Sequence, residues 1–272
     1  LESIQHIHVS DRGHFGATRI DAAREKVPAL GYVVENRVLG QVLYNALPHD
    51  HLTLFMPAKV MSVKPNTDDV EVQIHQQGEL KTLKTRLLIV ADGSQSNMRE
   101  QLGVGVTRRE YGQSAVIANV STEIPHDHIA YERFTSTGPL ALLPLTQQRY
   151  SLVWTHPSDN IAEVMSWSDA EFLVQLQAAF GYRQGRFTQV GKRSSYPLSL
   201  IKSTREIAAR SVILGNASHA IHPVAGQGLN LSLRDVAVLA DLLAEAVRDG
   251  ADVGALSLLE RYEQQRQGDY RT

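Results

Sequence analysis

The residues best suited to chemistry lie in a glycine-rich segment that joins an apolar run to a predicted helix. Residues 211–215 read as a buried strand, and the periodic apolar residues from 228 to 247 (Leu229, Leu233, Val236, Leu239, Ala240 and Leu243) predict an amphipathic helix. A helix N-terminus after a strand offers free N–H groups and a positive dipole end, and glycine lets backbone approach a ligand closely. The alternative is a turn without ligand. The candidate binding residues are Gly215, Asn216, Pro223, Gly226, Gln227, Gly228, Leu229 and Asn230.

A second candidate segment follows the apolar run 87–91, which is typical of a strand buried on both faces. Asp92 and Gly93 come directly after it, so they would lie at the carboxyl end of a parallel strand. Alone, an Asp-Gly pair predicts only a turn. A third candidate, Gln41, lies on the polar face of a helix predicted to start at Asn36 and to end before Pro48.

Several other kinds of chemistry are not supported by the sequence. The chain has no cysteine, and its net charge of -2 gives no basic surface for nucleic acid. His219 and His222 lie three residues apart without a third ligand in view, so no metal site is predicted. No apolar run reaches the roughly 18 residues of a membrane span, and no signal-peptide pattern opens the chain.

The elements that would position these residues indicate an α/β fold with an insertion. Four strands with β-branched and aromatic residues, at 115–120, 129–134, 140–145 and 150–154, are spaced as in an antiparallel sheet. Ser168 and Glu171 form a capping box that starts a helix ending at Gly181. We expect a parallel-sheet domain, formed by residues 28–114 and 206–272, and an inserted antiparallel sheet domain, formed by residues 1–27 and 115–205.

The chain resembles class A flavoprotein monooxygenases, the p-hydroxybenzoate hydroxylase fold. This resemblance implies that the parallel-sheet domain (28–114 and 206–272) binds FAD and that the antiparallel sheet domain (1–27 and 115–205) binds the substrate. The family's second flavin motif is Gly-Asp-Ala-Ala-His, then Pro, then Gly-x-Gly-x-Asn, then a helix with Asp. Its Asp is replaced here by Asn216, which keeps hydrogen-bonding capacity but carries no charge. The matching positions are Pro223, Gly226, Gly228, Asn230 and Asp235, while Asp92-Gly93 and Gln41 resemble the family's Asp-Gly motif and flavin-contacting Gln.

Within that family the chain resembles the hydroxylases of ubiquinone biosynthesis. The similar segments are 9–14, 132–135, 138–145 and 151–154. The resemblance implies FAD reduced by NAD(P)H, a C4a-hydroperoxide formed with molecular oxygen, and hydroxylation of a polyprenylated phenol. Sheet residues around Arg133, Leu142, Pro144 and Trp154 would form the substrate wall, although ordinary sheet packing explains such residues equally well. No general base is identified.

Two other functions stay open at this stage. The first is another oxidoreductase on the same fold, either a hydroxylase for a different ring position or a flavin-dependent isoprenoid reductase. The second is a non-catalytic assembly subunit with a flavin-site relic, which the replacement of the family's Asp by Asn216 suggests.

The family's N-terminal Gly-x-Gly-x-x-Gly turn is absent from the sequence, which starts at Leu1 without Met and ends at Thr272 in a helical stretch. We therefore expect a fragment that lacks the N-terminal βαβ unit and the C-terminal tail, and that retains little FAD by itself. We also expect a cytoplasmic protein, peripheral to the inner membrane. Because no basic amphipathic helix is present, membrane association would use the C-terminal part or partners in a ubiquinone-biosynthesis complex.

Overall fold

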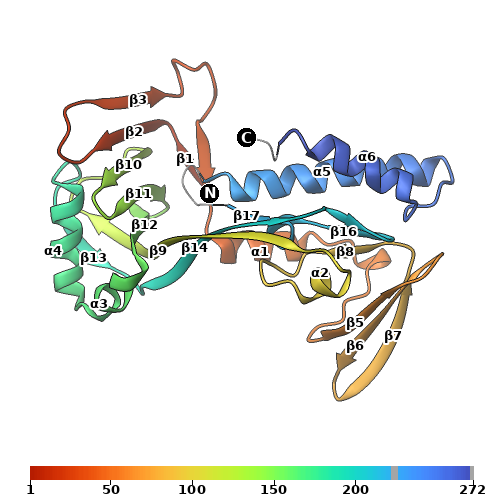
Figure 1. The fold of residues 1–272 in the computed structure, drawn as a ribbon. Helices are drawn as coiled ribbons and strands as arrows, with labels where there is room; N and C mark the ends of the chain where they lie inside the picture. The colour runs from red at the N-terminus through yellow and green to blue at the C-terminus, as the bar shows by residue number, and fades with distance from the viewer. Residues whose placement is uncertain (222–225, 270–272) are drawn as a thin grey trace. The chain divides into compact units, whose positions relative to one another are not determined.

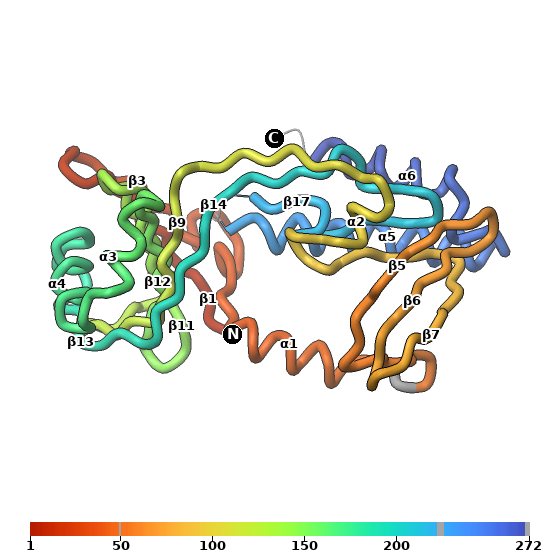
Figure 2. Tube along the Cα trace, turned by 60° about the horizontal axis from the view of Figure 1, so that its bottom comes forward, coloured from red at the N-terminus to blue at the C-terminus, as the bar shows by residue number. Residues whose placement is uncertain are grey.

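The computed structural model describes residues 1–221 and 226–269, and the chain divides into two compact units. Unit 1 comprises Leu1–Leu52 and Gly112–Leu198, and unit 2 comprises Thr53–Tyr111 and Ser199–Thr272. Two long strands, β9 (Val106–Thr122) and β14 (Ser194–Ser203), belong in part to each unit (Figure 2). None of the helices in the described residues has the length and hydrophobicity that a bilayer-spanning helix needs.

The main element of unit 1 is a sheet with the strand order β9-β12-β11-β10-β2-β3, and β13 also pairs with β9. The four strands predicted to form an antiparallel sheet pair antiparallel, as expected, while β2 pairs with β10 in parallel. The chain between β2 and β10 passes through unit 2, and a long connection permits parallel pairing that a tight turn forbids. The bounds are β2 (His6–Asp11), β3 (Ala17–Asp21), β10 (Ile129–Thr135), β11 (Gly138–Leu145), β12 (Arg149–Pro157) and β13 (Phe187–Val190).

One face of this sheet is covered by helix α4 (Asp169–Phe180), which follows η2 (Ser158–Asn160) and α3 (Ile161–Ser166) (Figure 1). The predicted capping box of Ser168 and Glu171 is present, and the helix ends at Gly181 as expected. Each buried apolar side chain contributes about 1.5–3 kcal/mol to such a core. The helix contributes Phe172, Leu176, Ala179 and Phe180, and the sheet contributes Leu140, Leu142, Leu152 and Trp154.

The rest of unit 1 consists of β1 (Glu2–Ile4), β4 (Gly31–Val33), α1 (Asn36–Asn45) and η1 (His49–His51). The sequence had placed 28–52 in the FAD-binding part, whereas these residues cluster with the large sheet. Two contacts explain this difference: β4 pairs with β1, and Glu35 accepts a hydrogen bond from Arg149 of β12 at 2.8 Å. No residue of α1 is buried.

Unit 2 contains two small sheets, one of them the antiparallel meander β5-β6-β7 (Figure 2). The other has the order β15-β16-β8, with β16 and β8 parallel. Helices α5 and α6 lie side by side (Figure 1) and pack on β16. The bounds are β5 (Lys59–Pro65), β6 (Val70–Gln76), β7 (Glu79–Thr85), β8 (Leu88–Val90), α2 (Asn97–Gln101), β15 (Ile207–Ala208), β16 (Ser211–Ile213), η3 (Gly215–Ala217), β17 (His219–Ala220), α5 (Gly228–Arg248) and α6 (Leu256–Arg266).

The two strands predicted to be buried on both faces, β8 and β16, differ in their burial. All of β16 is buried, whereas Ile89 of β8 is 45% exposed. Val212, the register partner of Ile89, packs with α5 and α6. This helix pair covers Val212 but leaves Ile89 uncovered, so the prediction for β8 was wrong on one face.

The predicted bounds of α5 are correct to one residue, but the predicted apolar face is wrong in its first half. Leu229, Leu233 and Val236 are more than half exposed, and the buried positions are Asp235, Leu239, Leu242 and Ala246. The helix is rotated so that Asp235 faces inward, because that carboxylate binds Arg266 of α6.

Candidate functional site

The two predicted loops leave the same edge of the β15-β16-β8 sheet. β8 and β16 are parallel, with Val90 paired to Ile213, so their carboxyl ends meet. The pairing continues beyond the strands, since Leu214 N–H donates to the Val90 carbonyl at 2.9 Å. Asp92 and Gly93 therefore lie beside Gly215 and Asn216, as expected for ligand-binding loops at the end of a parallel pair.

A buried arginine joins these loops. Arg99 of α2 is 1% exposed and donates through Nη1 to the Ala217 carbonyl at 2.7 Å and, more weakly, to the Ser94 carbonyl at 3.5 Å. Ser96 caps α2 by accepting from Arg99 N–H at 3.0 Å, which fixes the backbone that carries the guanidinium. The sequence analysis did not single out Arg99, because an arginine in a short polar helix reads as solvated.

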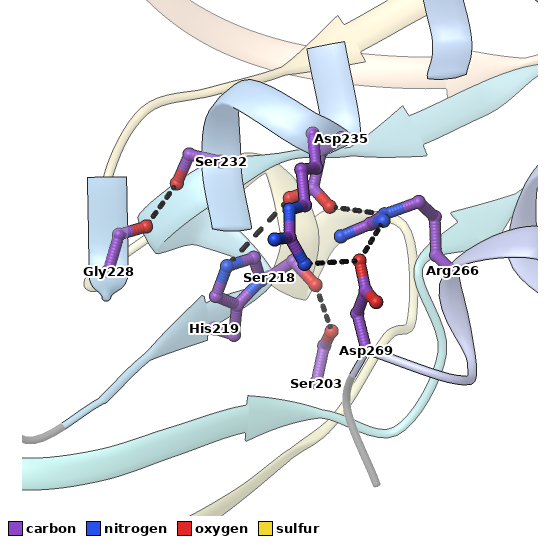
Figure 3. Close-up of polar contacts among 9 residues, drawn as sticks. Ser203, Ser218, His219, Gly228, Ser232, Asp235, Arg266 and Asp269 are labelled. Carbon is purple, nitrogen blue, oxygen red and sulfur yellow. Dashed lines mark hydrogen bonds and ion pairs between the residues drawn. The ribbon is translucent and has the colours of Figure 1, made fainter. Parts of the chain in front are cut away.

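The η3 loop also packs against the first turns of α5. Gly215 has φ +56°, and a Cβ there would lie 3.3 Å from Oγ of Ser232. The Ser232 hydroxyl donates back to the Gly228 carbonyl at 3.1 Å (Figure 3). Glycine at 215 thus lets the loop after β16 approach the N-terminus of α5, which brings the two halves of the predicted motif together.

A buried ionic network joins α5 to β17 and to the end of α6 (Figure 3). Asp235 accepts from Nε of Arg266 at 2.7 Å, and Arg266 also donates to Asp269 at 2.5 Å. His219 of β17 lies with Nε2 at 3.8 Å from the second carboxylate oxygen of Asp235. Ser218 is held by Ser203, with the hydroxyl oxygens 3.1 Å apart. These contacts fix both sides of the glycine-rich segment.

His219 belongs to this network. Burial lowers the pKa of His219, although Asp235 acts in the opposite direction, so the imidazole is neutral at neutral pH. Its neighbour in sequence, His222, lies outside the described residues. Among residues 1–221 and 226–269 there is no group of three side chains suited to hold a metal ion.

The N-terminus of α5 fits a flat, electron-rich ligand such as a flavin ring. Gln227 precedes the helix without capping it through its side chain, so the first-turn N–H groups have no intrahelical acceptor. Among the described residues, a Cβ at Gly228 would meet Ile221, at 3.9 Å, so the packing of these residues does not require glycine there. The exposed side chains around this position are those of Asn216, Gln227, Leu229 and Asn230.

The structure brings the predicted FAD-site residues of unit 2 into one cluster. It contains Asp92, Gly93, Gly215 and Asn216 at the sheet edge and residues 226–230 at the start of α5. Pro223 lies outside the described residues. Gln41 belongs to unit 1, where its side chain is exposed on α1.

The predicted substrate-wall residues lie in unit 1, and two of them are wholly within its core. Leu142 and Trp154 pack under α4, which the alternative of ordinary sheet packing explains. Pro144 is buried on β11, and Arg133 is partly buried, with Nε donating to the Ala179 carbonyl at the end of α4 at 3.1 Å.

The opposite face of the same sheet carries a carboxylate that the sequence analysis did not single out. Glu132 is paired with Val9 on β2 and Ala141 on β11, and Ala141 is paired with Val153 on β12. All four residues are half-buried. Burial among these apolar neighbours raises the pKa of Glu132. The sequence did not indicate this burial, because Glu132 lies at a polar position of an alternating strand, next to Arg133.

Comparison with known proteins agrees with this geometry. The family model described as FAD binding domain matches residues 5–269. The chain belongs to this FAD binding domain family. The match includes both loops, the intervening sheet unit and α5, so the family assignment covers nearly the whole chain.

Similar family members include hydroxylases of ubiquinone biosynthesis. The ubiquinone hydroxylase UbiL of Rhodospirillum rubrum is 39% identical over 91% of this chain and 57% of its own length. The 3-demethoxyubiquinol 3-hydroxylase of Escherichia coli is 34% identical over 92% of this chain and 63% of its own length. An uncharacterized Synechocystis protein is 36% identical over 97% of this chain and 65% of its own length. The chain thus spans 57–65% of the length of these relatives.

Solved structures share the fold at low sequence identity. The probable FAD-dependent monooxygenase pqsL of Pseudomonas aeruginosa has a TM-score of 0.77 at 22% identity, covering 98% of this chain and 74% of that chain. Klebsiella pneumoniae HpxO, complexed with FAD and uric acid, has a TM-score of 0.72 at 20% identity, covering 97% of this chain and 68% of that chain. The predicted α/β fold with an inserted sheet is therefore confirmed.

Proposed function

We propose that this chain belongs to an FAD-dependent, NAD(P)H-using monooxygenase that hydroxylates the aromatic ring of a polyprenylated phenol in ubiquinone biosynthesis. The observation that carries the proposal is the uncapped N-terminus of α5, which lies next to Gly215 and the parallel strand ends. The names of the Rhodospirillum and Escherichia relatives supply the substrate class.

In the net reaction one atom of molecular oxygen enters the ring and the other leaves as water, with two electrons from NAD(P)H. FAD, when bound, supplies the oxygen activation. The α5 N–H groups, including that of Gly228, would hold the flavin ring and stabilise negative charge on it through the positive end of the helix dipole. Asn216 would hydrogen-bond the ribityl chain as a neutral partner, and Arg99 would keep the two loops in register.

On the substrate side we propose a role for the half-buried sheet face rather than the face under α4. Arg133, Leu142, Pro144 and Trp154 would then support the wall from behind, and Glu132 would face the phenol. A carboxylate with a raised pKa is a suitable acceptor for a phenolic proton, because its basicity lies nearer to neutral pH. Deprotonation makes the ring more electron-rich, which favours hydroxylation.

We also propose a cytoplasmic enzyme that works at the inner membrane, alone or with partners of a ubiquinone-biosynthesis complex. A polyprenyl tail partitions into lipid, so the enzyme must meet its substrate at a bilayer surface or receive it from another protein.

The experiment is product analysis with the full-length protein, FAD, NAD(P)H and a prenylated phenol. The expected result is a ring-hydroxylated product containing one atom of labelled oxygen, in proportion to the NAD(P)H consumed. Reduction of the prenyl chain instead would indicate an isoprenoid reductase. Normal FAD binding without NAD(P)H oxidation would indicate a non-catalytic subunit. Either result would refute the hydroxylase proposal.

A further inference from the structure

Two exposed aromatic residues lie on turns at one end of unit 1. Phe15, in the turn between β2 and β3, is the most exposed large hydrophobic residue of the described chain, with a relative accessibility of 110%. Tyr182, two residues after α4, is 71% exposed. Exposed single apolar residues are common, so their exposure alone decides nothing.

The two turns are neighbours in space. The β2–β3 turn starts beside β10, where Arg12 N–H donates to the Phe134 carbonyl at 2.9 Å. Arg133 links this end of β2 to the end of α4, since its guanidinium donates to the Ala179 carbonyl at 3.1 Å and to Ser10 Oγ at 3.5 Å. Figures 1 and 2 both show the β2–β3 turn at the end of unit 1 where α4 lies.

Positive charge gathers around the same place. Besides burial, the nearby guanidinium groups of Arg12 and Arg183 lower the pKa of Arg133. Burial is also the first cause of the lowered pKa of His8, followed by Arg183, Arg19 and Arg133. The four arginines therefore lie within electrostatic reach of one another, and Arg12, Arg19 and Arg183 are exposed.

Among the charges that act on His8 and Arg133, the arginines outnumber the acidic residues, of which Asp11 is the one that acts. Asp11 Oδ2 lies 2.8 Å from Nδ1 of His14, and the Asp11 charge also acts on Arg133. Asp127 acts on Tyr131 and Tyr150 at the other side of His8. The local charge is positive, whereas the whole chain carries -2. A partner that prefers this end must be anionic.

Aromatic side chains at projecting turns, flanked by arginine, match the chemistry of an anionic bilayer surface. Aromatic rings are favoured at headgroup level, and each arginine near an anionic leaflet adds about 1 kcal/mol of attraction, roughly 5-fold in affinity. We propose that this basic aromatic end of unit 1, formed by residues 12–19 and 181–183, binds the surface of an anionic lipid bilayer.

The sequence contains no basic amphipathic helix, and this surface is not apparent from it. The surface is formed by two turns that are far apart in the sequence, so no periodic pattern predicts it. The proposal goes beyond the hydroxylase function, because lipid binding is measured without flavin or turnover and can fail or succeed independently.

The experiment is flotation of the full-length protein with phosphatidylcholine vesicles, with and without phosphatidylglycerol. We expect binding to the anionic vesicles only, and release by added salt. The triple variant Arg12→Gln, Arg19→Gln, Arg183→Gln should bind roughly 100-fold more weakly, as three lost attractions predict. The matched controls Arg108→Gln and Arg248→Gln, at exposed positions of unit 2, should bind normally.

A second variant tests insertion directly. Phe15→Trp places a fluorophore at the turn, and its emission should shift to the blue with anionic vesicles and stay unchanged with neutral ones. The control Tyr196→Trp, at a 55% exposed position of β14, should not respond. The proposal would be overturned by an absence of vesicle binding, by equal binding to neutral vesicles, or by an equal loss of vesicle binding in the control variants. An end of unit 1 that binds another protein instead of lipid would give the first of these results.

Discussion

Helices α4 and α5 both follow a loop and both pack on a sheet, but their N-termini differ in how the first N–H groups are satisfied. The N-terminus of α4 is satisfied internally: Glu171 accepts from Ser168 N–H at 2.8 Å, and Ser168 Oγ accepts from Glu171 N–H at 3.2 Å. At the N-terminus of α5, the N-cap residue Gln227 makes no side-chain cap among the described residues. A helix that stabilises a core caps itself, while a helix that binds a ligand leaves its first N–H groups available.

The buried faces of the two helices differ as well. The buried residues of α4 are all apolar, whereas α5 buries Asp235 in front of Leu239. A buried carboxylate costs desolvation energy that its arginine partner must offset. The buried face of α4 therefore stabilises the fold without ionic pairing. The buried face of α5 is less stabilising, but its carboxylate fixes the position of α5 relative to β17 and α6. Three substitutions test this contrast, and a fourth, on β10, tests the substrate side.

The largest effect is expected for Asp235→Leu, which removes the buried carboxylate partner of Arg266 and leaves it with Asp269, whose side chain is partly exposed. Removal of one partner of a buried ion pair costs about 3–5 kcal/mol, measurable as a shift of the urea unfolding midpoint. The double variant Asp235→Leu, Arg266→Met should recover part of this loss, since the buried guanidinium is gone and Asp269 is partly exposed. A cost below about 1 kcal/mol in the single variant would mean that the network does not anchor α5.

Gly228→Val tests the open N-terminus of α5. The nearest atom to a Cβ at this position is Ile221 Cγ1 at 3.9 Å, so the fold should tolerate the side chain. A bound flavin would not, and overpacking by about 3 kcal/mol corresponds to flavin binding roughly 100-fold weaker. Flavin content and thermal unfolding of the full-length protein report the two effects separately.

The matched control for Gly228→Val is Ala237→Val, which adds similar bulk to the same helix at an exposed position. It should leave flavin content unchanged. Normal flavin content in Gly228→Val would place the ligand elsewhere.

Glu132→Gln tests the substrate side. Loss of a general base typically costs about 100-fold in rate. The raised pKa of Glu132 sets the sign of the pH dependence: the carboxylate is the active form, so kcat/KM should rise as pH increases through this pKa. In Glu132→Gln this rising limb should disappear, while flavin content stays normal. If Glu132→Gln kept the wild-type pH profile, Glu132 would not be the general base.

The contrast between the helices also explains what could be predicted from the sequence. The bounds of α4 follow from Ser168, Glu171 and Gly181, which act within one helix. The start of α5 follows from its glycine motif. The burial of Asp235 does not follow, because its partner Arg266 is 31 residues away and a charge reads as solvent-facing in a periodicity argument.

The same limit explains the other differences. The exposure of Ile89 and the desolvation of Glu132 depend on which distant elements pack on their strands. Neither an apolar run nor an alternating strand pattern shows which elements these are. Arg99 joins two loops that the chain separates by 118 residues, so only the parallel pairing of β8 and β16 brings its partner within reach.

The smallest effect is expected for Ser168→Ala, which removes the cap of α4. Loss of a serine N-cap costs about 1 kcal/mol, and the reciprocal bond from Ser168 N–H to Glu171 should survive because it uses the backbone. The unfolding midpoint should fall slightly with an unchanged denaturant dependence, and flavin content should stay normal because α4 belongs to the core of unit 1. The conservative variant Ser168→Thr keeps the hydroxyl and should restore most of the loss. If Ser168→Ala instead reduced flavin content as strongly as Gly228→Val, α4 would not be the purely structural helix of the pair. The difference between a self-satisfied and an open N-terminus would then have no functional meaning in this protein.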